Sequence, residues 1–209
     1  MPLDLAILKF INHTIANPVL DIIFRYIGDF RLWAIPIFIT VILLLWKGGA
    51  RGRWLVGMSI LTVILVDGSI HLIIKPLFHR LRPSHVDPAI TWLQLIAGRG
   101  GTYGFPSSHA ANTFSQAVIV GAFYKRSRIY MFVFAILVSI SRVYLGVHYP
   151  SDILGGAVYG ALIGVLILYL AGILVPEQRA LYFPGRELAR LDSQIRVGIS
   201  PKSKDDSAP

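Results

Sequence analysis

Cysteine is absent from this chain of 209 residues. The sequence therefore contains no disulfide, no thiolate nucleophile and no cysteine-based metal site. Charge is also scarce: charged residues make up 15% of the chain, whereas a soluble domain carries about a quarter. Hydrophobic residues reach 55% and gather in long runs. These deficits exclude an ordinary soluble domain and predict a polytopic membrane protein.

The apolar runs predict an all-α fold, a membrane helix bundle of five to six transmembrane helices. The N-terminal residues 3–27 are amphipathic and are interrupted by a turn at Asn17-Pro18. They fit either two short helices at the membrane interface or one irregular, shortened span. The five clear spans are expected at roughly 30–46, 54–75, 106–124, 129–145 and 150–175.

One domain is expected at this length. We assign residues 1–175 to a single membrane-embedded domain, in which residues 1–29 form the interfacial or short N-terminal helices. Residues 176–209 read as a polar cytoplasmic tail, and the composition of its end predicts disorder. Polar residues interrupt the first apolar stretch at Asp4 and Lys9, so no cleavable signal peptide is expected.

The basic residues indicate orientation. A net charge of +9 would suggest a nucleic acid partner in a soluble protein, but here the charge is divided between the two membrane faces. Three Lys and Arg lie in 47–53, three in 125–128 and six in 179–204, which sums to twelve. That side is predicted to be cytoplasmic. The opposite, extracytoplasmic face of a bacterial-type inner membrane carries only Arg80, Arg82 and Arg99, with Lys75 at the boundary.

Ionisable residues join the last two spans. Pro150 suits the first position of a helix, so Tyr149 should cap that helix and Asp152 should fall in its first turn. His148 then lies just outside, within reach of the Asp152 carboxylate, and Arg142 ends the preceding span. Such groups are costly at a membrane and indicate a functional site. A carboxylate-held histidine beside an arginine suits attack on an anionic phosphorus centre, and a chance polar turn is the alternative.

Two further motifs are expected on the same face. Lys75 and Arg82, followed by Pro83, can grip a phosphate through a point charge and a planar fork, although snorkelling side chains would look similar. Pro106 should open the third span and place Ser107, Ser108 and His109 in its first turn. Free amides and the helix dipole make such a turn an anion site, and an ordinary helix cap is the alternative.

Together these motifs resemble the three-part signature of the type 2 phosphatidic acid phosphatase superfamily, in its membrane lipid phosphatase branch. Order and internal spacing match throughout, and the one departure is Ser108, where the usual pattern has glycine. Bacterial undecaprenyl-diphosphate and phosphatidylglycerol-phosphate phosphatases are similar examples. The matching motifs are Lys75-x6-Arg82-Pro83, Pro106-Ser107-Ser108-His109 and Ser141-Arg142-x5-His148-x3-Asp152.

The resemblance implies a mechanism through a phosphohistidine intermediate. His148 attacks phosphorus, Asp152 orients His148, and His109 protonates the leaving oxygen before activating the hydrolytic water. The resemblance implies neither a metal nor another cofactor, because cations and amides supply the electrostatic stabilisation. The implied phosphate-binding residues are Lys75, Arg82, Ser107, Ser108 and Arg142.

The expected substrate is a lipid phosphate held in the membrane, and a polyprenyl diphosphate such as undecaprenyl diphosphate is favoured. Phosphatidylglycerol phosphate, phosphatidic acid and lipid A phosphate are the alternatives. Arg80 and Arg99 are the only hint of a second phosphate, and solvated loop charges would look the same. A non-catalytic lipid-phosphate binder or transporter is the alternative from another class, although the two halves show no repeat. No oligomeric state is predicted.

Two other patterns concern packing. Asp67 and His71 lie four residues apart, so they share a helix face. They are expected to form a polar pair inside the bundle rather than extend the site. Gly156, Gly160 and Gly164 form a stripe of small residues, expected to pack inside the bundle rather than mark a dimer face.

The nucleophile assignment makes a direct prediction. His148→Ala should abolish phosphate release while the protein still folds, because the substitution removes the attacking imidazole but adds no bulk. The measurement is turnover of the purified variant beside its thermal unfolding in detergent. Retained turnover would sink the assignment.

Overall fold

The computed structural model describes residues 2–86 and 89–182. The end of the polar tail, predicted to be disordered, lies outside these residues. The predicted all-α fold is confirmed, and the only extended pairing among the described residues is an isolated bridge between Leu81 and Tyr103. The elements are α1 Pro2–Lys9, η1 Phe10–Thr14, α2 Pro18–Gly28, α3 Phe30–Lys47, α4 Gly49–Ser69, η2 Ile70–Ile74, α5 Lys75–Phe78, η3 Pro83–His85, α6 Ser108–Phe123, η4 Lys125–Ser127, α7 Arg128–Tyr144, α8 Pro150–Leu174, η5 Pro176–Gln178 and α9 Arg179–Tyr182.

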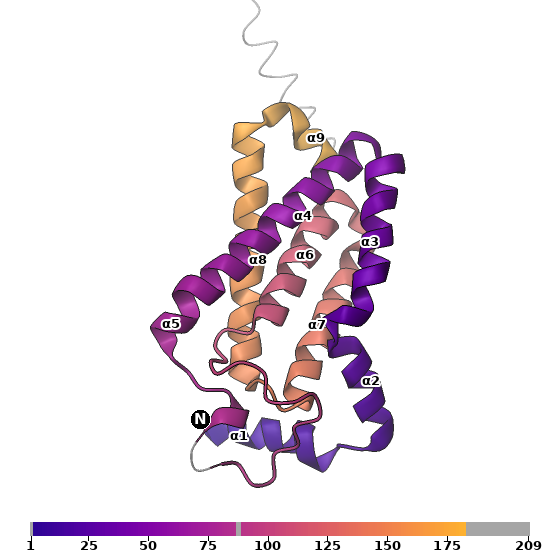
Figure 1. Ribbon diagram of the computed structural model, residues 1–209. Helices are drawn as coiled ribbons and strands as arrows, with labels where there is room; N and C mark the ends of the chain where they lie inside the picture. The colour runs from indigo at the N-terminus through magenta and orange to yellow at the C-terminus, as the bar shows by residue number, and fades with distance from the viewer. Residues whose placement is uncertain (1, 87–88, 183–209) are drawn as a thin grey trace, which may run out of the picture.

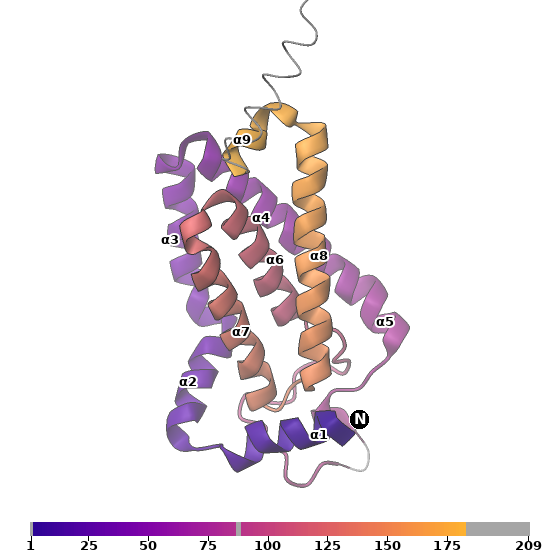
Figure 2. The same ribbon diagram turned by 180° about the vertical axis from the view of Figure 1, so that it is seen from behind.

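The described residues include four helices that are long and apolar enough to cross a membrane, or up to five if the bent N-terminal pair forms one span. Each predicted span corresponds to a helix, but the third, α6, has only 16 residues. It is about 24 Å long at the usual rise, shorter than the roughly 30 Å hydrocarbon core. It lies in the middle of the bundle, packed against α4, α7 and α8 (Figures 1 and 2).

Close packing of α6 on α8 depends on the predicted glycine stripe, which is buried in this contact. A Cβ atom on Gly160 would lie 2.0 Å from the carbonyl oxygen of Ala111, and one on Gly156 would lie 2.4 Å from that of Ser107. Only a residue without a side chain allows such an approach. The prediction that the stripe packs inside the bundle is therefore confirmed.

The N-terminal residues form two helical segments, Pro2–Thr14 and Pro18–Gly28, that meet at 116°. The first lies across one end of the bundle, and α2 then rises beside α7 (Figure 1). Asn17 makes the bend by capping α2: its side chain accepts from the amides of Val19 and Leu20. Buried Asn12 donates to the carbonyls of Gln94 and Tyr144 at 2.8 and 2.7 Å, which fixes the segment against the loops.

The two ends of the bundle differ in their residues. The α3–α4 and α6–α7 connections, with their basic residues, lie at the end that holds α9 (Figures 1 and 2). There Tyr182 is buried against Phe123, with ring centroids 5.4 Å apart, so the first residues of the predicted tail pack on the bundle. The α7–α8 turn and the start of α6 lie at the opposite end, where α1 crosses. The three sequence motifs therefore meet at one end.

The contact of α6 with α8 predicts a large effect from one methyl group. Gly160→Ala should destabilise the protein by about 1–3 kcal/mol, because the new Cβ overlaps backbone that cannot move aside. Thermal unfolding in one detergent measures this. Gly57→Ala is the matched control, since nothing lies within 4 Å of the Cβ added there. Equal melting temperatures for the two variants would contradict the packing.

Candidate active site

The α7–α8 turn presents a buried histidine and a buried aspartate. Tyr149 caps α8 and Pro150 takes its first position, as predicted. The Asp152 Oδ2 atom accepts from the Tyr149 amide at 3.0 Å and lies 3.3 Å from His148 Nδ1. His148 is 1% exposed and Asp152 0%. If His148 Nδ1 donates its proton to this carboxylate, Nε2 keeps a lone pair for attack.

Burial lowers the pKa of His148 well below its usual value, and the positive charges of Arg82, Arg142 and Lys75 lower it further. A hydrogen bond to the backbone of Gly104 acts in the opposite direction. The imidazole is therefore neutral at pH 7, the form that can act as a nucleophile.

Three cations act electrostatically on His148: Lys75, Arg82 and Arg142. Lys75 is buried, and among the described residues no carboxylate lies within ion-pair distance of Lys75, Arg82 or Arg142. Arg82 Nε donates to the Tyr103 carbonyl at 3.2 Å, and Arg142 uses one nitrogen on the Gly28 carbonyl at 2.8 Å. Arg142 Nε is buried without a partner in the described part of the chain. Uncompensated donors and charge of this kind favour an anion.

Arg80 behaves differently, because two carboxylates neutralise it. Its guanidinium lies 2.7 Å from Asp152 Oδ1 and 2.8 Å from Asp4 Oδ2. It also donates to the Ser151 hydroxyl at 2.6 Å and stacks over the Tyr149 ring. Arg80 is thus occupied in holding Asp152 and does not resemble the suggested second phosphate grip.

The start of α6 departs from the prediction. The helix begins at Ser108, and Ser107 is its N-cap rather than a first-turn residue. The Ser107 amide donates to the Asp152 carbonyl at 2.9 Å, so it is not available to a phosphate as expected. The amides of Ser108 and His109 remain free at the helix N-terminus. The His109 ring interacts electrostatically with Arg142, His148, Arg82 and Lys75, which places it with them.

Asp67 and His71 do not form the predicted pair. Asp67 Oδ1 accepts from Asn112 at 2.9 Å, and His71 Nε2 lies 3.3 Å from the Ser108 hydroxyl. Each side chain therefore binds a residue of α6. Their spacing of four matches that of Ser108 and Asn112, a signal that becomes visible only when the two helices are paired.

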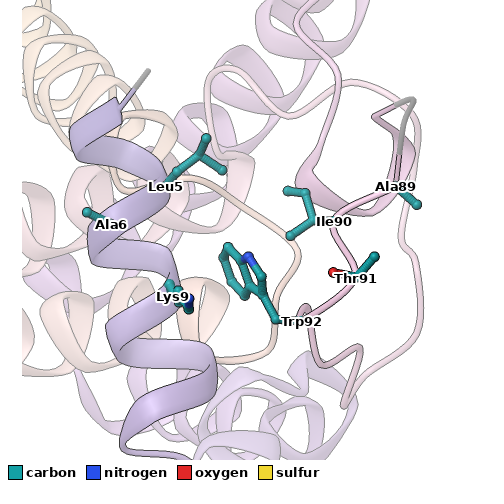
Figure 3. A pocket seen from close by; sticks show the side chains of 7 residues that line it. All are labelled: Leu5, Ala6, Lys9, Ala89, Ile90, Thr91 and Trp92. Atoms are coloured by element: carbon teal, nitrogen blue, oxygen red, sulfur yellow. The ribbon is translucent and has the colours of Figure 1, made fainter.

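A shallow pocket of about 400 Å³ lies beside α1 at the same end of the bundle (Figure 3). The Lys9 ammonium stands over the Trp92 ring, 5.9 Å from its centroid. None of the residues assigned to catalysis or phosphate binding lines this pocket, so it is separate from the buried histidine. Its lining residues are Leu5, Ala6, Lys9, Ala89, Ile90, Thr91 and Trp92.

Comparisons with known proteins agree on a family. Residues 56–174 match the model of the PAP2 superfamily. A lipid A 4'-phosphatase of Bacteroides thetaiotaomicron is 32% identical over 93% of this chain and 89% of its own. The crystal structure of Aquifex aeolicus LpxE superposes with a TM-score of 0.62 at 25% identity, over 80% of this chain and 95% of that one. A PAP2-type phosphatidylglycerolphosphate phosphatase from Bacillus subtilis gives a TM-score of 0.59 at 25% identity, over 79% and 83%.

The chain therefore belongs to the PAP2 superfamily. It is a multi-pass membrane protein and a lipid phosphatase of a metal-independent family, as the motifs predicted.

The lowered pKa of His148 predicts how stability depends on pH. The histidine of the unfolded chain titrates near pH 6.5, so protonation below this pH favours the unfolded chain. The contribution of neutral His148 to the free energy of unfolding is therefore complete above about pH 6.5 and is lost as the pH falls below it. His148→Asn removes this contribution. The drop in melting temperature from about pH 7.5 to about pH 5.5 should be smaller in this variant than in the wild type. An equal drop in the variant and in the wild type would contradict the prediction.

Proposed function

We propose that the protein removes a phosphate monoester from a glycolipid of the lipid A type. One observation carries the proposal: a buried, neutral His148 held by Asp152 lies among three cations for which the described part of the chain provides no ion partner. A phosphate monoester dianion supplies the missing negative charge at that place. The site also contains a nucleophile, His148, and an acid–base group, His109, neither of which is needed for binding alone.

In the proposed reaction His148 Nε2 attacks phosphorus. A nitrogen–phosphorus bond forms, the bond from phosphorus to the lipid oxygen breaks, and His109 gives that oxygen a proton. His109 then takes a proton from water as the water oxygen attacks phosphorus. The nitrogen–phosphorus bond breaks, inorganic phosphate leaves and the His148 imidazole is restored. Asp152 holds the imidazole and balances its positive charge. Lys75, Arg82 and Arg142, with the Ser107 and Ser108 hydroxyls and the free amides of α6, stabilise the phosphoryl oxygens.

Two observations favour a phosphate monoester over the polyprenyl diphosphate that the sequence favours. Arg80, which the sequence suggested together with Arg99 as a ligand of a second phosphate, is already neutralised by Asp4 and Asp152. A relative named as a lipid A 4'-phosphatase matches nearly the whole chain. The comparisons thus support the lipid A alternative better than undecaprenyl diphosphate. The likeness to a phosphatidylglycerolphosphate phosphatase makes that lipid the second candidate.

Location and domain organisation form part of the proposal. The site lies at the end of the bundle opposite the basic loops, so the positive-inside rule supports an extracytoplasmic site. Residues 1–175 would then act as one membrane-embedded domain with residues 176–209 on the cytoplasmic side. A site at the membrane boundary allows the acyl chains to remain in the bilayer while the phosphate reaches His148.

Phosphate release from four lipids, with EDTA present, tests the proposal. The lipids are lipid A, phosphatidylglycerol phosphate, phosphatidic acid and undecaprenyl diphosphate. We expect the highest kcat/KM on lipid A, because a monoester on a sugar matches the relative's named substrate. His148→Ala is the control for contaminating phosphatase. A higher kcat/KM on undecaprenyl diphosphate would overturn the substrate, and release by the control variant would overturn the mechanism.

A further inference from the structure

We propose that Arg80 is a positioning residue for catalysis, and that Asp4 makes the N-terminal helix α1 part of the support of the active site. The inference rests on the proposed roles of His148 and Asp152. Among the described residues, the Arg80 side chain makes no hydrogen bond to His148 or His109, so it acts through Asp152.

The contacts form a chain from α1 to the carboxylate. Asp4 Oδ1 accepts from the Ser151 amide at 3.0 Å, and Asp4 Oδ2 accepts from the Ser151 hydroxyl at 2.6 Å. The second Asp4 oxygen also meets the Arg80 guanidinium at 2.8 Å. The other guanidinium nitrogen holds Asp152 Oδ1 at 2.7 Å. Asp4 and Arg80 therefore bind the first turn of α8 through Ser151 and Asp152. The Tyr149 ring stacks on the guanidinium, with its centroid 4.8 Å from the guanidinium carbon.

The two oxygens of Asp152 have separate partners. Oδ1 takes the guanidinium, while Oδ2 takes the Tyr149 amide and faces His148. Fixing Oδ1 prevents rotation of the carboxylate about its axis and keeps Oδ2 aimed at His148 Nδ1. A second partner of this kind sets the orientation and basicity of the group that it holds.

Charge gives Arg80 a second role. Asp4 and Asp152 interact unfavourably with one another, and the guanidinium lies between them. Without it, the Asp4 carboxylate would face the buried Asp152 carboxylate with no cation between them, and protonation of Asp152 would relieve the repulsion. A protonated Asp152 does not stabilise the imidazolium that forms as His148 attacks.

The network joins the N-terminal helix to the region matched by the superfamily model, which contains Arg80. The superfamily match starts at residue 56, whereas Asp4 comes from the N-terminal helix. Arg80 itself lies between Lys75 and Arg82, both assigned to phosphate, so its sequence position alone suggests another phosphate ligand. Its two short ion pairs argue for support instead.

Kinetics of four variants test the inference: Asp4→Asn, Arg80→Gln, Arg80→Lys and the double variant of Asp4→Asn with Arg80→Gln. We expect kcat to fall about 10-fold in Asp4→Asn and about 100-fold in Arg80→Gln, with KM within about twofold of the wild type. Arg80→Lys should recover part of the loss, because it keeps the charge but not the fork. The double variant should lose no more than Arg80→Gln alone, since the two residues act as one unit.

Arg25→Lys is the matched control, because Arg25 also ties an N-terminal helix to a loop, through the Ile96 carbonyl at 2.8 Å, but lies outside this network. It should keep the wild-type kcat. A phosphate-binding role would raise KM instead, and independent roles would give losses that multiply; either result overturns the inference. A purely structural role would lower the melting temperature and kcat together, with no recovery in Arg80→Lys.

His148→Ala separates this inference from the proposed function. If wild-type turnover depends on His148 while the Arg80 and Asp4 variants keep full kcat, only the inference fails. If the His148→Ala variant turns over as fast as the wild type, the proposed function fails whatever the Arg80 and Asp4 variants do.

Discussion

The site depends on one buried charge, the carboxylate of Asp152. A carboxylate removed from water is costly unless its oxygens are paired and hydrogen-bonded. Two partners are local, the Tyr149 amide and the His148 ring, and the third, the Arg80 guanidinium, comes from the loop after α5. The backbone of the same residue accepts from the Ser107 amide. The hydrogen bonds of this one residue therefore hold the loop after α5, the start of α6 and the α7–α8 turn together.

The basic residues of the site divide according to their partners. Arg80 is neutralised by Asp4 and Asp152, whereas no carboxylate of the described residues pairs with Lys75, Arg82 or Arg142, the cations proposed to bind phosphate. Mutual repulsion of three such cations works against folding. A phosphate dianion removes much of that repulsion. Attraction of the anion and the electrostatic cost to stability therefore have the same origin, which is expected where function opposes stability.

Local chemistry was predictable from sequence, and contacts between distant segments were not. Pro150 and Tyr149 specify the start of α8 through neighbouring residues, so the placement of His148 beside Asp152 followed from the sequence. The start of α6 was set by Ser107 capping the helix and by its amide reaching Asp152, a contact across 45 residues that periodicity does not show. Asp67 and His71 were paired by helical spacing, but side chains of α6 offered better partners. The ion pair of Arg80 with Asp4 joins residues 76 apart, and nothing local announces it.

The packing of α6 against α8 positions the residues of the candidate active site. Gly156, nearest the site in the glycine stripe, lets α8 approach the carbonyl of Ser107 so closely that a Cβ would overlap it. The same approach brings the Ser107 amide to the Asp152 carbonyl. A larger residue at Gly156 would separate the two helices where they carry His109 and Asp152. The distance between His109 and Asp152, the proposed acid–base group and the proposed support of the nucleophile, therefore depends on the absence of a side chain at Gly156.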